Sequence, residues 1–398
     1  MSHREQSEIV VFAGHTRLMI VCVALAFLLP AVAGFFTNHK ARQSWEKREL
    51  AVLPNVIEAK SSKHFFTDLE AFIDDHIGFA TPLNKIYRQL QFYVFSDSPI
   101  ANVDVGDDGF VFFNAHSATR PYAAIKKICR PSTPHIKKTE RAMAAFASAV
   151  REYGASISYA IVPSKPLLYP QELPATVPAP HRKACLALDP LQSAAGQLRE
   201  RASGKDYAVH FPVEELLSMR NEPAFYPPGN FHSASKINHV FAAGLLRSLD
   251  IDPGTAYSKG ARLQMINADM RVMGFVRSVQ AWTYPYADFR VSVNRGKPEW
   301  VTRYYSRARD FGTYVSARPA SNRSALLLSN SFGAFVAPHL APGFKSLTHI
   351  NLNALQESEA ALFLQQIMER VKPDDLIVLF HDGGIPSAPL YMLANAAL

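Results

Sequence analysis

The sequence has 398 residues, of which 48% are hydrophobic and 19% are charged. This length and composition indicate a globular chain with a large core and exclude a mainly disordered protein. The formal net charge is +8, but the Lys and Arg residues are scattered. Because no zinc-finger spacing or aromatic RNA-binding motif occurs, nucleic acid is not an expected partner.

An uncharged apolar run extends from Leu18 to Phe36 and is long enough to cross a bilayer. It is either an uncleaved signal anchor or a signal peptide cleaved after Ala33, where Ala31-Val-Ala33 has the small-x-small form. Residues 1–45 are therefore expected to be a tail, membrane segment and linker, and residues 46–398 the functional domain. Either segment would export the domain from the cytoplasm. The count of Lys and Arg on the two sides of the run favours the reverse, with the domain in the cytoplasm.

Three cysteines are present. Cys22 lies in the apolar run, which leaves Cys129 and Cys185 in the predicted domain. A disulfide between these two and a pair of unrelated buried thiols both agree with the sequence. No Cys-x-x-Cys motif occurs and the His residues lack metal-ligand spacing, so no metal and no other cofactor is expected.

The hydrophobic pattern predicts an α/β fold for the domain. Two amphipathic helices are expected over 64–95 with a break near 78–82, followed by a β-hairpin over 103–113. Further on, helices alternate with apolar strands, which predicts a mostly parallel sheet flanked by helices. The expected helices are 133–154, 191–202, 213–220, 235–249 and 355–371; the expected strands are 156–162, 207–211, 324–328 and 376–380. Residues 255–322 have weak periodicity and are expected to form strands and loops.

The stretch Leu326–Gly333 is a candidate active-site segment because a buried strand runs into the turn Ser329-Asn330-Ser331 and then a helix start. A serine beyond the carboxyl end of a parallel strand lies in the crevice where open α/β sheets bind ligands. Ser331 is the candidate nucleophile, and Ser329 and Asn330 are candidate oxyanion donors. The alternative for Ser331 is a turn serine that caps the following helix.

The short motif Asn230-Phe-His232 supplies candidate partners for this serine. His232 is the candidate base and Asn230 the residue that orients it. The alternatives are a solvated or N-capping histidine and a plain turn asparagine. The combination predicts a catalytic set of Ser331, His232 and Asn230.

Several motifs together resemble the SGNH hydrolase-like polysaccharide O-acetyltransferases, the family of the alginate O-acetylation proteins AlgJ and AlgX. The resemblance covers residues 46 to about 380 in order. No single motif is specific to the family. The resemblance rests on seven motifs that occur in the family's order. The motifs are Glu46–Pro54, Phe72–Phe79, Val105–Phe112, Val162–Pro170, Asn230-x-His232, Ser329–Phe332 and Lys372–Asp374.

The resemblance implies a periplasmic domain, held in the inner membrane by a single N-terminal anchor or released by cleavage near Ala33. It also implies that Ser331 accepts an acetyl group from a membrane-bound O-acyltransferase partner and passes it to a hydroxyl of an exported polysaccharide. His232 would take the proton of the serine and later that of the sugar hydroxyl.

Two departures from the family pattern bear on the chemistry. Asn230 stands where the family has an acid, and Ser329 stands where a glycine usually starts the nucleophile turn. An Asn can hold an imidazole but cannot stabilise an imidazolium by charge. Asp382, in the stretch His381-Asp-Gly-Gly384, is a candidate for the missing charge.

Two functions from different classes therefore remain open. The first is a periplasmic polysaccharide O-acetyltransferase with acetylesterase-type chemistry, which the presence of Ser331 and His232 favours. The second is a catalytically degenerate family member that binds glycan or acts as a scaffold in a modification or export complex, which the departures at Asn230 and Ser329 favour. A lipase-like hydrolase is disfavoured because the sequence has no Gly-x-Ser-x-Gly elbow.

Overall fold

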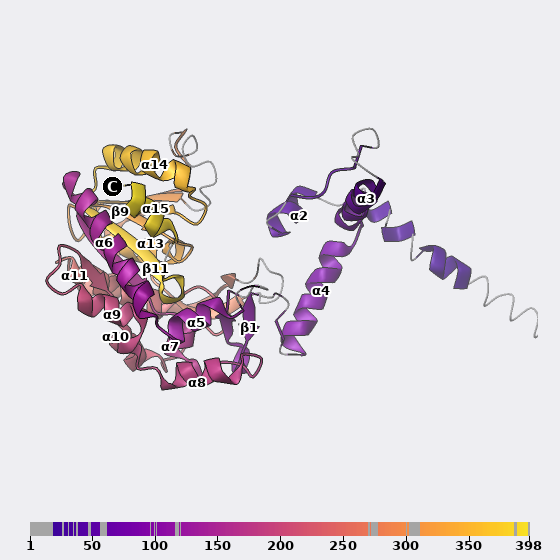
Figure 1. Ribbon diagram of the computed structural model, residues 1–398, viewed down its shortest axis with the longest axis horizontal. Helices are drawn as coiled ribbons and strands as arrows, with labels where there is room; N and C mark the ends of the chain where they lie inside the picture. Colours follow the sequence, from indigo (N-terminus) through magenta and orange to yellow (C-terminus); the bar gives the residue numbers. More distant parts are fainter. Residues whose placement is uncertain are drawn as a thin grey trace, which may run out of the picture. The chain divides into compact units, whose positions relative to one another are not determined.

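A computed structural model gives the fold (Figure 1). The structure describes residues 19–25, 28–30, 32–34, 36, 39–46, 49–55, 62–95, 97–98, 100, 102–115, 119, 121–269, 271, 278–299, 301, 311–385 and 388–396. The chain forms two compact units: Met1–Phe95 with Arg271–Phe275, and Ser96–Met270 with Val276–Leu398. The units divide after Phe95, so residues 46–95 of the predicted functional domain lie in the first unit.

The first unit contains α2 (His39–Glu46), α3 (Ser62–His76) and α4 (Ala80–Tyr93). The two amphipathic helices expected over 64–95 are present, and the chain breaks between them at Phe79, whose φ is 64°. Several residues of the predicted apolar run 18–36, among them 18, 26, 27, 31 and 35, lie outside the described residues. Within the described part of the chain, no helix is both long and apolar enough to cross a membrane.

The second unit is built on a seven-stranded sheet with the order β4-β3-β11-β9-β10-β8-β7. The first five strands are parallel, and β8 and β7 join antiparallel at one edge. The predicted mostly parallel sheet is therefore confirmed. The strands are β3 (Ser156–Val162), β4 (Ala208–His210), β7 (Val291–Asn294), β8 (Phe311–Ser316), β9 (Ser324–Ser329), β10 (Ser346–Asn351) and β11 (Asp375–His381).

Helices flank this sheet, as the alternating pattern predicted. Its central strands β3, β9 and β11 are almost wholly buried, as parallel strands with both faces covered must be. One group of helices contains α6, which packs on α9 and α15, and another contains α13, which packs on α11 (Figure 1). The helices are α5 (Ala123–Cys129), α6 (Thr133–Glu152), α7 (Lys165–Leu168), α8 (Ala179–Ala187), α9 (Ala194–Arg201), α10 (Val213–Met219), α11 (Lys236–Ser248), α13 (Gly333–Leu340), α14 (Glu357–Val371) and α15 (Ala388–Ala396).

Two short antiparallel pairs lie outside the main sheet. The predicted hairpin is present as β1 (Val103–Val105) and β2 (Val111–Phe113). Its turn includes Asp108 at φ 51° and Gly109 at φ 73°, which is the left-handed region that tight turns require. The second pair is β5 (Arg262–Asn267) and β6 (Ser278–Thr283), in the segment of weak periodicity.

Cys129 and Cys185 form a disulfide that joins α5 to α8, with a Cα–Cα distance of 4.6 Å. The sequence left open a disulfide or two unrelated thiols, and the structure has the disulfide. The bond links residues 56 positions apart and restrains the unfolded chain accordingly.

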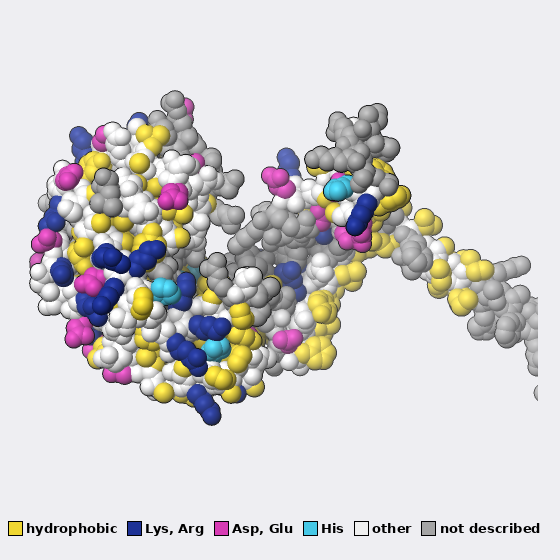
Figure 2. All heavy atoms as spheres, viewed as in Figure 1, with side chains coloured by type: hydrophobic (Ala, Val, Ile, Leu, Met, Phe, Trp, Pro, Cys, Tyr) yellow, Lys and Arg dark blue, Asp and Glu magenta, His cyan; other side chains and the backbone are white. Residues whose placement is uncertain are grey.

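On the face of the second unit that Figure 2 shows, Lys and Arg side chains are interspersed with Asp and Glu.

Candidate active site

The candidate nucleophile Ser331 lies between the end of β9 and the start of α13. None of Ser329, Asn330 and Ser331 has a positive φ, so the turn needs no glycine at position 329. The glycine that matters is Gly333. A Cβ at Gly333 would overlap the Oγ and Cβ atoms of Ser329 and lie 2.8 Å from His349 Nε2. The tight approach of α13 to the end of β9 is therefore made possible by a glycine four residues later than the family pattern predicts.

The structure brings Ser331 and His232 together. The Nε2 atom of His232 lies 2.9 Å from Ser331 Oγ, although the two residues are 99 positions apart. His232 enters the site from the loop before α11, and its ring stacks on Phe335 of α13 at 4.6 Å between ring centroids. The imidazole is therefore held on one face by packing while one nitrogen meets the serine hydroxyl.

The carboxylate of Asp269 holds the other side of the imidazole. Its Oδ2 atom lies 2.9 Å from His232 Nδ1 and accepts the backbone N–H of His232 at 2.6 Å. Its Oδ1 atom accepts the N–H of Phe231 at 3.1 Å. Because a carboxylate only accepts, Nδ1 carries the proton and Nε2 is left to accept the hydroxyl proton of Ser331. Asp269 was not predicted from the sequence, since no motif surrounds it and it follows β5 in the weakly periodic segment.

The predicted role of Asn230 as the partner of the His232 ring needs correction, because Asp269 occupies Nδ1. Asn230 is buried, and its Oδ1 atom accepts the backbone N–H of Asp269 at 3.2 Å. It thus acts one step further from the serine and positions the acid. The other candidate for the missing charge, Asp382, is used elsewhere: its carboxylate accepts N–H groups of Ser164 and Gly383.

Lys165 supports the loop that carries His232. Its buried ammonium donates to the carbonyl oxygens of Pro227 at 2.9 Å and Asn230 at 2.6 Å, and also to that of Pro228. Burial lowers the pKa of Lys165 to about 7, and the negative charge of Asp269 opposes this shift. One side chain from the first residue of α7 therefore fixes three backbone carbonyls shortly before His232.

The predicted oxyanion donors divide into used and unused groups. The hydroxyl of Ser329 donates to the Asn330 carbonyl at 2.7 Å and lies 2.8 Å from His349 Nε2, and the N–H of Asn330 donates to Leu379. These groups already have hydrogen-bond partners within the protein and are not free to bind an oxyanion. Among the residues that the structure describes, no acceptor is found for the backbone N–H of Ser331 or for Nδ2 of Asn330. These two donors beside the nucleophile are the ones left for an oxyanion.

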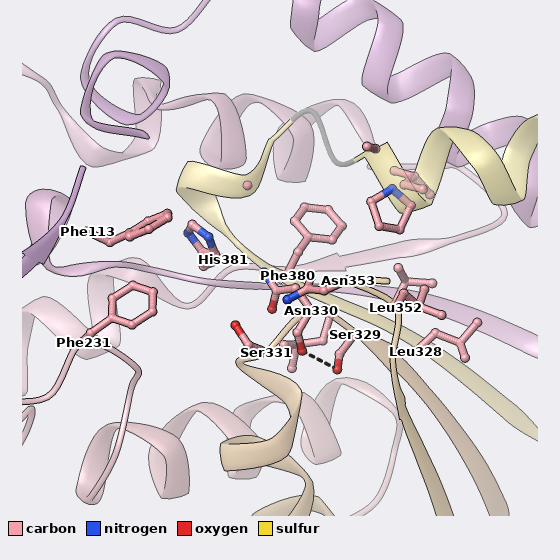
Figure 3. Close-up of a pocket in the computed structure, with 16 residues that line it drawn as sticks. Phe113, Phe231, Leu328, Ser329, Asn330, Ser331, Leu352, Asn353, Phe380 and His381 are labelled. Carbon is pink, nitrogen blue, oxygen red and sulfur yellow. Dashed lines mark hydrogen bonds between the residues drawn. The ribbon is translucent and has the colours of Figure 1, made fainter. Parts of the chain in front are cut away.

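A cavity of about 320 Å³ opens beside Ser331 at the carboxyl ends of β9 and β11. Figure 3 shows Ser331 between Phe113, Phe231 and His381 on one side and Leu328 and Leu352 on the other. The lining is mainly apolar, with a few polar side chains, and comprises Phe113, Phe231, Leu328, Ser329, Asn330, Ser331, Leu352, Asn353, Val378, Leu379, Phe380, His381, Gly384, Ala388, Pro389 and Leu390. Within the described ranges, no group of three or more His, Cys, Asp or Glu side chains is placed to hold a metal ion.

The fold of the chain is similar to that of solved structures. No protein-family model and no curated protein sequence matches the chain. A structure of Bacillus cereus PatB1 with a sulfonyl adduct matches 73% of this chain and 97% of its own, at 13% identity and a TM-score of 0.50. A DHHW family protein from Eubacterium siraeum and the O-acetyltransferase domain of Pseudomonas putida AlgJ each match over 74% of this chain, and over 94% and 99% of their own. Their identities are 10% and 11% and their TM-scores 0.49 and 0.45. The match to PatB1 shows a shared fold.

Proposed function

We propose that this protein is a serine-dependent O-acetyltransferase that moves an acetyl group onto hydroxyls of an exported polysaccharide. The observation that carries the proposal is the continuous line from Ser331 Oγ through both nitrogens of His232 to Asp269, with separations of 2.9 Å at each step. This is the geometry of a nucleophile, a base and an orienting acid. The motif resemblance to the polysaccharide O-acetyltransferases supplies the acetyl group and the glycan.

In the first half-reaction, Ser331 Oγ attacks the carbonyl carbon of the acetyl donor and His232 Nε2 takes the hydroxyl proton. The N–H of Ser331 and the amide of Asn330 receive the developing oxyanion. The C–O bond to the donor breaks, and the imidazolium returns its proton to the departing alcohol. In the second half, a sugar hydroxyl attacks the acetyl-serine, loses its proton to His232, and leaves as the ester while Ser331 regains a proton. Asp269 remains ionised throughout and stabilises the imidazolium.

The expected setting is the periplasmic side of the inner membrane, with the apolar run 18–36 as anchor or cleaved signal. The disulfide between Cys129 and Cys185 supports an oxidising compartment. The resemblance adds a membrane-bound O-acyltransferase as the acetyl donor. A scaffold without catalysis was favoured by Asn230 and Ser329, but Asp269 supplies the carboxylate and Ser329 lies in ordinary strand geometry. Both reasons for that alternative are thereby weakened.

The test is acyl transfer by the purified full-length chain with p-nitrophenyl acetate as donor. Mass spectrometry of peptides from the quenched protein should find an acetyl group on Ser331. The adduct should be absent in Ser331→Ala and should accumulate far more slowly in Asp269→Asn. A folded protein that releases nitrophenol no faster than Ser331→Ala between pH 6 and 9 would point to the binding or scaffold role.

A further inference from the structure

A second imidazole stands close to the reaction centre. His381 ends β11, and the pairing of Leu379 with Ser329 places His381 and Ser331 each two residues beyond the same rung of neighbouring strands. His381 lines the cavity beside Ser331. None of the reaction steps proposed above uses this side chain.

The aromatic ring of Phe332 connects the two imidazoles. Its centroid lies 5.0 Å from that of His232 and 4.8 Å from that of His381, so the residue after the nucleophile separates the two rings. On the opposite edge Phe113 lies 6.2 Å from His381, and Phe231 lies 4.8 Å from Phe113. His381 is therefore fixed by packing, and Phe332 contacts both its ring and that of His232.

The ring of His381 is largely buried, and its Nδ1 atom is wholly buried. The residue is 9% exposed, and no partner is found for its buried Nδ1 atom among the residues described. The nearest carboxylate oxygen is Oδ1 of Asp382, at 3.9 Å, and Asp382 is itself held by the N–H groups of Ser164 and Gly383. Because the Nδ1 atom is wholly buried, a ligand in the cavity can reach only the other ring nitrogen, Nε2.

The other ring edge faces the cavity lining at Gly384. A Cβ built on Gly384 would stand 3.5 Å from His381 Nε2 and 3.7 Å from Asn330 Nδ2. These are ordinary van der Waals distances, so an alanine fits here but fills the space between the two polar groups. The absence of a side chain at Gly384 thus leaves His381 and Asn330 open to the same ligand.

The cavity is suited to an uncharged ligand. Among the described residues that line it, none is Lys, Arg, Asp or Glu. A carboxylate bound there would lose its hydration without a cation to pair with, which is costly. The faces of Phe113 and Phe231, together with the polar groups of His381 and Asn330, suit a ring that has apolar faces and hydroxyl edges.

We propose that this cavity is the acceptor site of the O-acetyltransferase, that the acceptor is an uncharged sugar, and that His381 positions it by hydrogen-bonding one of its hydroxyls. The proposal rests on the proposed function for its chemistry. His381 transfers no proton in the reaction: the attacking hydroxyl forms the ester bond to the acetyl carbon and gives its proton to His232. The role of His381 is to choose and orient the sugar.

The experiment measures how acetylated enzyme divides its acetyl group between water and a sugar. The full-length protein is mixed with p-nitrophenyl acetate and methyl β-glucoside, and the ratio of sugar ester to free acetate is determined. The ratio should fall about tenfold in His381→Ala, the value of one hydrogen bond, and partly recover in His381→Gln. Gly384→Ala should also lower it, whereas His135→Gln, a substitution on α6 away from the cavity, should not. Methyl β-glucuronide should be at least tenfold poorer than the glucoside.

Several results would overturn the proposal. An unchanged ratio in His381→Ala, or equal losses in nitrophenol burst and sugar ester, would make His381 merely structural. A glucuronide that accepts as well as the glucoside would exclude an uncharged acceptor. If wild-type protein shows no burst, the proposed function fails, and the sugar site is then tested by a binding measurement alone. Saturation-transfer NMR of methyl β-glucoside with Ser331→Ala should show contacts that the double variant Ser331→Ala/His381→Ala loses, and equal signals in both would refute the sugar site.

Discussion

Asp269 contacts His232 at two points: one carboxylate oxygen lies 2.9 Å from Nδ1 and accepts the backbone N–H of the same residue at 2.6 Å. The ring and its backbone are thus oriented by one group, which leaves Nε2 directed at Ser331. The carboxylate is largely removed from water, with 5% of its side chain exposed. Because a shielded charge acts more strongly on a neighbouring imidazolium, this relationship provides the electrostatic part of the proposed catalysis.

The first prediction ranks Asp269 above Asn230. Asp269→Asn should lower the turnover of an acetyl ester about ten-thousand-fold, because the amide cannot hold the same tautomer or stabilise the imidazolium. Asn230→Ala should cost much less, since only the N–H of Asp269 loses a partner. Stopped-flow kinetics with matched melting temperatures measures both. A larger loss in Asn230→Ala would return the orienting role to Asn230.

The second prediction concerns the buried lysine beneath the His232 loop. Lys165→Met should lower the free energy of unfolding by about 3 kcal/mol, because the buried loop carbonyls lose their hydrogen-bond donor. The folded-state pKa of about 7 lies below the usual 10.5, so unfolding takes up a proton between these values. Stability from this group is therefore least below pH 7 and rises toward pH 10.5. Urea unfolding should show that rise in the wild type and a flatter profile in Lys165→Met.

The third prediction couples Gly333 to Ser329. Gly333→Ala should destabilise the protein and slow acylation, because the new Cβ overlaps the Ser329 side chain. Ser329→Gly removes the overlapping atoms and leaves only the contact with His349. The double variant should therefore recover part of both losses, which a double-mutant cycle measures. Strict additivity of the two changes would show that the turn relaxes by another route.

The fourth prediction concerns acid. Burial lowers the pKa of His239 to about 4 and of His339 to about 3, and His339 Nδ1 lies 2.6 Å from the hydroxyl of Tyr286. The unfolded chain binds protons at these residues near pH 6.5, whereas the folded protein does not. Stability from this cluster is therefore complete above pH 6.5 and is lost as the pH falls toward 4. The urea midpoint should drop over this range, and His339→Gln should lessen the drop. An equal drop in the variant would assign the acid sensitivity elsewhere.

Local sequence patterns determined a large part of the fold. Strand β3 lies over 156–162 as predicted, and the hairpin around Gly109 and the helix beginning at Thr133 are also in place. These elements rest on short-range features: an unbroken apolar run, a turn sequence and a helix cap. The same locality makes Ser331 recognisable, since a serine two residues beyond a buried strand is visible in a stretch of eight residues.

The tertiary structure alone decided which carboxylate meets His232. Asp269 lies 37 residues further along in a segment of weak periodicity, and its place depends on how the loop after β5 folds back on Phe231. Strand β10 was not predicted for a related reason. Its sequence Ser-Leu-Thr-His-Ile-Asn contains many polar residues, and their burial depends on partners such as the Ser329 hydroxyl, which contacts His349. A sequence shows what each residue can bond, but long-range chain closure selects the partner, because that choice depends on contacts between segments far apart in the chain.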